Sequence, residues 1–296
     1  MSVRLVGLDF ETTGQDPASC GVVQAAYVEW TVGEWSTLAD DWTNTEVQAE
    51  AVVCNPGEPI PLGSTLVHGI TDSAGADRAR AALEREPTII TAEHYHFAAF
   101  AGQLLGEIER DDGILVSYNG AGFDLPILER HARRKLAGRH VDVYRLHKQS
   151  SAAATPCEHV KGGWPASLFK ASLSAAHAFW TGELFDGAHD ALVDVRATLR
   201  TFAAMLDHPS AGWTIEAALR ATTEPLPGDV DFDGKLRWDH EGEAVWTVGK
   251  NAGILLRDLD AGFLRWVLNK DFHPDTKAII RAAQRGQYPT RKTTPT

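Results

Sequence analysis

Two acids at the end of an apolar stretch have the type and spacing to bind divalent cations. Asp9 and Glu11 stand two residues apart at the end of VRLVGLDFE. Residues i and i+2 of a strand point to the same side about 6.6 Å apart, so both carboxylates can reach one point in front of a sheet. Two ions about 3.5 to 4 Å apart suit that separation and serve phosphoryl chemistry, and oxygen ligands suit Mg²⁺ or Mn²⁺. Taken alone, the pair favours two unrelated acids at a solvent-facing strand end.

Two later motifs carry further candidates. In NGAGFD a strand ends at Asn119 and Asp124 opens a helix, where an acid is also favoured simply by the helix dipole. In GAHDALVD, His189 follows Gly187 and Asp194 lies about one turn into a long helix. Each later motif should arise by chance in on the order of a few per cent of chains this long, and both in order far more rarely. The joint pattern therefore predicts that these acids and the histidine form one site.

Periodicity indicates the elements that must position this site. Period-two alternation predicts strands, three-four spacing of apolar residues predicts helices, and Pro and Gly mark the loops. Thr71 or Asp72 could cap a helix. Strands are expected at 3–11, in GVVQAAYVEW, in EWSTLADDW with AVVCNPGEPIP, and in GILVSYN; helices at 95–108, in FDLPILERHARRKL, and at 192–206. Strands that then alternate with helices predict an α/β domain.

The domain organisation follows from where these patterns stop. We expect a large domain at 1–208 and a linker with a short helix at 209–228. A small α+β module, with an aromatic hairpin followed by two helices, is expected at 229–290, and a disordered tail at 291–296. For Trp238, Trp246, Phe263 and Trp266 a small aromatic core is preferred to a base-stacking platform.

Composition narrows the function classes. The 296 residues carry a formal net charge of −12, which argues against broad nonspecific binding of duplexes. The segment 128–150 is nevertheless locally basic, which on charge alone favours a solvated helix face. Three cysteines without C-x-x-C spacing support neither disulfides nor a thiolate zinc site. Without a charged leader or a long apolar stretch, the chain is expected to be soluble, cytoplasmic and free of the membrane.

The three motifs together resemble those of the DnaQ-like, DEDDh-type 3′-to-5′ exonucleases, over roughly residues 3 to 206. NPGEPIP with VHGITD, and Asp142 in VDVYRLH, are secondary similarities. The resemblance implies a ribonuclease H-like fold, with a central mixed β-sheet flanked by helices. It also implies two divalent ions, Mg²⁺ or Mn²⁺, held by the four acids: Asp9, Glu11, Asp124 and Asp194. Residues 229–290 resemble, more weakly, an accessory module found behind some bacterial and phage exonucleases.

The sequence departs from the family pattern at two places. Gln24 stands where many relatives carry an acid, and 149–166 is a longer insertion than the family minimum. Neither touches the five core positions. The insertion leaves the substrate open, because a loop there could border the substrate groove.

The predicted activity is two-metal hydrolysis of the terminal phosphodiester at a free 3′ end of DNA or RNA, which releases nucleoside 5′-monophosphates. His189 is the predicted general base, because an imidazole accepts protons near neutral pH. Thr12 and Thr13 are candidates for holding the terminal nucleotide, with structural capping as the alternative, and Phe123 favours core packing over stacking. The other substrate candidates are Asn119 and, for phosphate contacts, Arg130, Arg133, Arg134 and Lys135.

Two alternatives stay open at this stage. One is a catalytically silent exonuclease fold that serves as a scaffold in a polymerase or repair complex. The intact set of acids speaks against it, since a silent protein has no reason to keep repelling carboxylates together. The other is an RNA-trimming oligoribonuclease. The expected partners are nucleic-acid 3′ ends, mainly single-stranded, with a polymerase or repair protein as a further candidate in a proofreading or DNA repair role.

Overall fold

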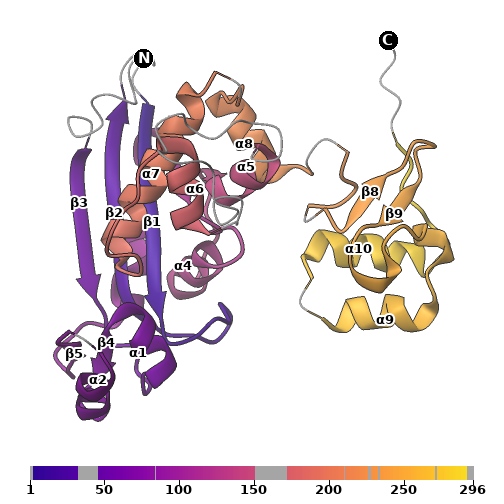
Figure 1. Ribbon diagram of the computed structural model, residues 1–296. Helices are drawn as coiled ribbons and strands as arrows, with labels where there is room; N and C mark the ends of the chain where they lie inside the picture. The colour runs from indigo at the N-terminus through magenta and orange to yellow at the C-terminus, as the bar shows by residue number, and fades with distance from the viewer. Residues whose placement is uncertain are drawn as a thin grey trace. The chain divides into compact units, whose positions relative to one another are not determined.

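The computed structural model describes residues 3–32, 46–83, 85–150, 172–209, 211–225, 228–232, 234–270 and 272–291. The chain divides into two compact units, Met1–Thr222 and Thr223–Thr296 (Figure 1). This division falls inside the segment 209–228 that we expected as a linker. Helix α8 (Ile215–Thr223) lies in that segment, and its buried Ile215 and Ala218 join the larger hydrophobic core.

The first unit is built on a five-stranded mixed sheet. Its order is β3-β2-β1-β6-β7, in which β1, β2 and β3 pair antiparallel while β1, β6 and β7 pair parallel. The strands are β1 (Val3–Thr12), β2 (Val22–Val32), β3 (Glu46–Val53), β6 (Ile114–Ser117) and β7 (Arg139–Asp142). The predicted α/β class with a mixed central sheet is confirmed. The stretch EWSTLADDW lies outside the described residues.

Helices cover both faces of this sheet. One core joins the sheet to α5, α6, α7 and α8, through residues such as Leu5, Phe179 and Leu199. The other joins it to α3 and α4, through Leu8, Leu105 and Ile127. Besides α8, the helices described in this unit are α1 (Leu62–His68), α2 (Ala76–Ala82), α3 (Ala101–Glu109), α4 (Asp124–Ala132), α5 (Val143–Ser150), α6 (Leu173–Thr181) and α7 (Ala191–Asp207). The small parallel pair β4 (Ile70–Asp72) and β5 (Thr88–Ile90) lies beside α1 and α2 in Figure 1.

Two local predictions were wrong in detail. The helix expected at 95–108 is a 3₁₀ turn, Phe97–Ala99, followed by α3, because Phe100 leaves helical geometry with a φ of −128°. Neither Thr71 nor Asp72 caps α2, whose N-cap is Gly75. The Asp72 carboxylate instead accepts hydrogen bonds from the backbone of Gly75 at 2.7 Å and Ile60 at 2.9 Å, which fixes the turn before the helix.

Helix α7 runs along β1 and β2 at close range (Figure 1). A Cβ atom added at Gly7 would lie 2.6 Å from Cγ1 of Val195 and 3.0 Å from Leu199. Real Cβ atoms do not approach other atoms that closely, so the glycine permits this contact between strand and helix. The consequence is that the end of β1 and the start of α7 lie side by side.

The second unit has its own small core. The hairpin β8 (Leu236–Trp238) and β9 (Ala244–Trp246) packs with α9 (Ala261–Asn269) and α10 (Pro274–Ala283). The Asp231 carboxylate accepts hydrogen bonds from the backbone of Leu236 at 2.9 Å and from the Thr276 hydroxyl. Trp246 is buried as expected for a core residue, whereas Trp266 is 46% exposed and does not fit the predicted core role.

A carboxylate cluster at the edge of the sheet: a candidate active site

The end of β1 presents the first two acids. Val6, Leu8 and Phe10 point into the core shared with α3 and α4, so Asp9 and Glu11 point to the opposite face, where α7 lies. Glu11 is buried and Asp9 is partly buried. The pairing of β1 with β2 shifts register directly after Glu11, where the strand ends. The D-x-E pair thus lies at the C-terminal end of β1, the central strand, where the strand leaves the sheet.

Asp124 reaches the same place from the start of α4. Because β6 runs parallel to β1, the loop after β6 leaves the sheet at the same edge. The Asp124 carboxylate is buried and accepts a hydrogen bond from the backbone N–H of Phe10 at 3.0 Å. The contact ties the first turn of α4 to the middle of the D-x-E pair.

The start of α7 supplies the histidine and the fourth acid. His189 lies in a loop with a positive φ of 69°, two residues after Gly187 at 84°, and its side chain is exposed. Its backbone N–H donates to the Asp194 carboxylate at 3.0 Å. Side-chain ligand atoms of Glu11, His189 and Asp194 all lie within 4.8 Å of one another. The structure therefore brings the residues of the three motifs together.

Burial and mutual repulsion make the ionised cluster unfavourable without a counter-charge. Burial, then Asp194 and Asp124, raise the pKa of Glu11 to about 8. Burial raises the pKa of Asp124 to about 7 and that of Asp194 to about 6. Burial, followed by the charges of Asp124, Asp194 and Glu11, raises the pKa of Asp9 well above its usual value. A cation would remove this cost, because opposite charge favours the ionised carboxylates.

The donor set fits hard divalent cations. All four acids offer carboxylate oxygens, the ligand type that Mg²⁺ and Mn²⁺ prefer. One oxygen of the buried Asp194 carboxylate, Oδ1, has no hydrogen-bond partner among the described residues. An unpaired buried carboxylate oxygen is costly unless something absent from the chain binds it. The geometry groups Glu11 and Asp194 with His189, and the assignment of all four acids, Asp9, Glu11, Asp124 and Asp194, as ligands stays a prediction.

The raised pKa values give a testable pH dependence. In EDTA, the melting temperature should fall as pH rises from 6.5 to 8, because folded Glu11 keeps up to about pH 8 a proton that its unfolded carboxyl releases near 4.5. Below about pH 6.5 the trend is opposed by His68 and His140, whose pKa burial lowers to about 4. Mn²⁺ should raise the melting temperature most at pH 8. In EDTA, the melting temperature of Glu11→Gln should fall less steeply with pH than that of wild type. An equal slope in wild type and Glu11→Gln would contradict the cluster's electrostatics.

The threonines after the acids are buried and hydrogen-bonded within their loop. The Thr12 hydroxyl donates to the carbonyl of Gly14 at 2.7 Å, and the Thr13 hydroxyl donates to Glu58 at 2.5 Å. The backbone N–H of Gly21 donates to the Thr13 hydroxyl at 2.9 Å. The backbone of Thr13 is also paired, since its N–H donates to the carbonyl of Gly21 at 2.9 Å and its carbonyl accepts from the Ser64 hydroxyl at 2.8 Å. Nucleotide binding by the two threonines stays a prediction.

The predicted phosphate contacts have partners inside the chain. Arg130 donates to the carbonyl of Cys20 at 2.6 Å, and Arg134 forms an ion pair with Glu109 at 2.8 Å. Lys135 pairs with Glu129 at 2.5 Å. Arg133 ends α4 in the left-handed conformation and is exposed. A role in substrate binding stays a prediction for these residues and would require the paired ones to exchange partners.

Asn119 and Phe123 have structural roles in the loop that carries Asp124. Asn119 has a φ of 63°, and its backbone N–H donates to the buried Asp142 at 2.9 Å. Asp142 also accepts from the backbone of Ala121 at 3.1 Å. Phe123 is partly buried against the core of α3 and α4, as its preferred interpretation expected. Their contact with substrate stays a prediction.

Two residues that the motif analysis did not assign also border the site. Asp190 caps α7, and its charge adds to the repulsion on Asp9, Glu11 and Asp194. Gln24 joins β2 to this cap, since its amide oxygen accepts from the backbone of Ala191 at 3.1 Å. The signal for Asp190 was its place just before a helix, where Asp is a favoured N-cap. For Gln24 the signal was its departure from the acid common in the family.

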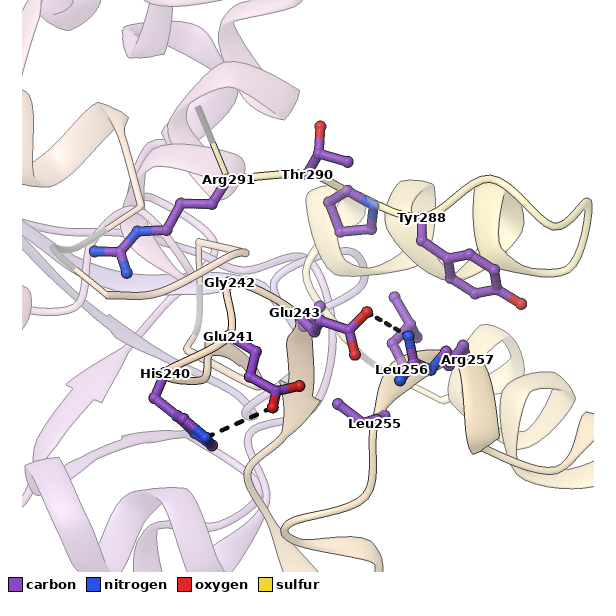
Figure 2. A pocket seen from close by; sticks show the side chains of 12 residues that line it. His240, Glu241, Gly242, Glu243, Leu255, Leu256, Arg257, Tyr288, Thr290 and Arg291 are labelled. Carbon is purple, nitrogen blue, oxygen red and sulfur yellow. Dashed lines mark hydrogen bonds and ion pairs between the residues drawn. The ribbon is translucent and has the colours of Figure 1, made fainter. Parts of the chain in front are cut away.

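A second group of acids lies in the hairpin of the other unit. Ligand atoms of Asp239, Glu241 and Glu243 lie within 4.8 Å of one another. Glu241 and Glu243 also line a hollow of about 500 Å³ (Figure 2). Asp239 accepts backbone hydrogen bonds from Glu241 at 2.9 Å and Glu243 at 2.8 Å, and Glu243 pairs with Arg257. Hydrogen bonds of the turn and this ion pair account for the grouping, so it is not a second metal site candidate.

Comparison with solved structures shows which fold this is. The chain superposes on E. coli exonuclease I bound to single-stranded DNA in its zinc form, with 19% identity and a TM-score of 0.50, covering 71% of this chain and 41% of the other. A second exonuclease I structure, which suggests how processivity is achieved, has 18% identity and a TM-score of 0.54, with 91% and 60% covered. The chain therefore spans about half the length of these proteins. At this identity the likeness establishes the fold of exonuclease I, a mixed sheet flanked by helices.

Two further comparisons gave no match: no family model and no curated protein matches the sequence. Within the described part of the chain, no helix has the length and apolar character needed to cross a membrane.

Proposed function

We propose that this protein is a metal-dependent 3′-to-5′ exonuclease that hydrolyses the terminal phosphodiester of DNA or RNA and releases nucleoside 5′-monophosphates. One observation carries the proposal. Four carboxylates from β1, α4 and α7 converge at one sheet edge with raised pKa values, and a buried Asp194 oxygen has no hydrogen-bond partner in the described part of the chain. A purely structural role would not explain keeping such repelling groups together.

The residues divide the work between binding and proton transfer. Asp9, Glu11, Asp124 and Asp194 would hold the cations. Two bound divalent ions supply Lewis-acid stabilisation of the phosphate charge and make a water more acidic. The exposed imidazole of His189, within 4.8 Å of Glu11 and Asp194 oxygens, takes the proton of the attacking water at a ring nitrogen. The backbone hydrogen bond from His189 to Asp194 fixes the loop while its side chain stays accessible.

The fold supports single-stranded ends as substrate. Exonuclease I, which shares the fold, has been solved with single-stranded DNA. The net charge of −12 disfavours wide contact with duplex backbones and suits engagement of a short terminal segment. Cytoplasmic location, and a polymerase or repair partner, stay predictions.

The experiment is a digest of 5′-labelled single-stranded DNA and RNA of one sequence, run in parallel. With Mg²⁺ or Mn²⁺ the label should move to progressively shorter products, and nucleoside 5′-monophosphates should appear; EDTA should stop both. The ratio of the DNA and RNA rates decides between a DNA exonuclease and an RNA-trimming enzyme. Full-length label under both metals, with the protein folded, would leave the silent scaffold as the better description.

A further inference from the structure

An aromatic hollow in the second unit lies outside the carboxylate cluster. It has a volume of about 460 Å³ and is lined by the rings of Trp246, Phe263, Trp266 and Phe272 and by the loop 248–251. Trp246 is 1% exposed and belongs to the core, while Trp266 is 46% exposed. The hollow therefore combines a fixed floor with one accessible indole.

Ring contacts hold that indole in one orientation. Trp266 stacks on Phe263 with centroids 5.5 Å apart and an interplanar angle of 20°, and meets Phe272 edge-on at 5.7 Å. Beneath it, Trp246 meets Phe263 at 5.1 Å and donates its indole N–H to the carbonyl of Val248 at 2.8 Å. An ordered indole offers a planar ligand a large contact area at low entropic cost.

One cation lines the hollow, and a second follows Trp266 in the chain. Lys250 and Asp260 both contribute to the lining, Lys270 follows Trp266 by four residues at the end of α9, and both lysines are exposed. The Asp260 carboxylate caps α9 by accepting a hydrogen bond from the backbone N–H of Phe263 at 2.9 Å. Neither lysine has an ion-pair partner among the described residues. Residues 223–296 contain eleven acidic and eleven basic residues, so the net charge of −12 belongs to residues 1–222. An anion with planar groups thus meets less repulsion here than on the rest of the chain.

We propose that this hollow binds single-stranded nucleic acid, with one base stacked on Trp266 and adjacent phosphates contacted by Lys250 and Lys270. Stacking platforms combined with cations are how proteins bind single strands without reading sequence. The site goes beyond the proposed hydrolysis, because binding here needs neither the carboxylates nor a metal. It would offset the poor affinity expected of an acidic nuclease. A proline-rich peptide is the competing ligand for an exposed tryptophan groove, and the lysines favour the nucleic acid.

The test is fluorescence anisotropy of a 5′-labelled oligothymidylate with the whole chain in EDTA, where no cleavage occurs. Trp266→Ala should weaken binding about 5-fold or more, the lower range for loss of one stacked base, while Trp266→Phe keeps most of the affinity. Lys250→Gln should lower the slope of log K against log salt by about 0.7, since one phosphate contact is lost. Tyr288→Ala is the matched control, because Tyr288 is 45% exposed and lines the hollow beside Glu241 and Glu243 instead (Figure 2).

Three outcomes would overturn the proposal: unchanged affinity in Trp266→Ala, equal losses in Trp266→Ala and Tyr288→Ala, or tight binding of a polyproline peptide that displaces no oligonucleotide. Trp266→Ala also removes ring contacts, so its melting curve is recorded. Lys250→Gln removes no core contact and decides the question if Trp266→Ala unfolds. Failure of the digest would leave this binding result untouched, so the two proposals fail separately.

Discussion

Asp194→Asn should reduce the exonuclease rate more than about 100-fold. Loss of a group that only orients a metal ligand costs up to about 100-fold, and Asp194 is itself a proposed ligand. The substitution keeps the size of the side chain and can keep its hydrogen bond to the His189 backbone. It removes the charge and one carboxylate oxygen; Oδ1, which has no partner among the residues that the structure describes, is the oxygen available to a cation. The loss should therefore appear in activity and in metal binding, with the fold intact.

The same substitution should stabilise the protein without metal. Burial, together with the charge of Asp190, raises the pKa of Asp194 to about 6, so the ionised group is unfavourable at neutral pH. In EDTA at pH 8 the melting temperature should rise by a few degrees, and the gain that Mn²⁺ gives wild type should shrink. Lower stability together with lower activity would mean that Asp194 serves packing instead.

Asp186→Asn is the matched control for this experiment. Asp186 precedes the same helix but is exposed and contributes to none of the raised pKa values of the cluster. Its rate should stay within about twofold of wild type, as for surface substitutions in general. Its melting temperature, with and without Mn²⁺, should stay within about a degree of wild type. A loss of rate equal to that of Asp194→Asn would mean that the rate depends on the total negative charge near the site and not on Asp194 in particular.

The spacing of apolar residues predicted the strand and the helix that carry the site, because this spacing reflects which face of each element is buried. The alternation of Val6, Leu8 and Phe10 identified β1, and the three-four spacing identified α7. The breaks were harder to predict. Phe100 leaves helical geometry within an otherwise helical apolar pattern, and β7 is only four residues long. A short strand contains too few residues to establish a period.

The contacts of polar side chains were beyond prediction, since they depend on distant segments. The basic run after Asp124 indicated a cationic surface, yet Arg130 reaches the carbonyl of Cys20 and Arg134 reaches Glu109. Gly7 looked like an ordinary strand residue, and only the fold shows that its missing side chain admits Val195. Motif order could predict which acids meet, but not the pairing of the cations around them.

His189→Gln should lower the rate at pH 7 by about 10² to 10⁴, the usual cost of losing a general base. Glutamine keeps a polar group in the loop but cannot accept the proton of water. The loss should shrink as pH rises, because hydroxide then replaces the base, so the pH profile of kcat/KM should differ in shape from that of wild type. The exposed His240, in the other unit, is the control: His240→Gln should leave the rate and the profile unchanged.

The position of His189 also permits a different role, which the same variant separates. Its ring lies within 4.8 Å of ligand atoms of Glu11 and Asp194, close enough for it to bind a cation itself. As a base, it leaves ion binding to the carboxylates, so Mn²⁺ should raise the melting temperature of His189→Gln as much as that of wild type. As a ligand, its loss would reduce that gain along with the rate. We expect the full gain, because the imidazole is exposed while Glu11 and Asp194 are buried, and the carboxylates alone provide the oxygen ligands that hard divalent ions prefer.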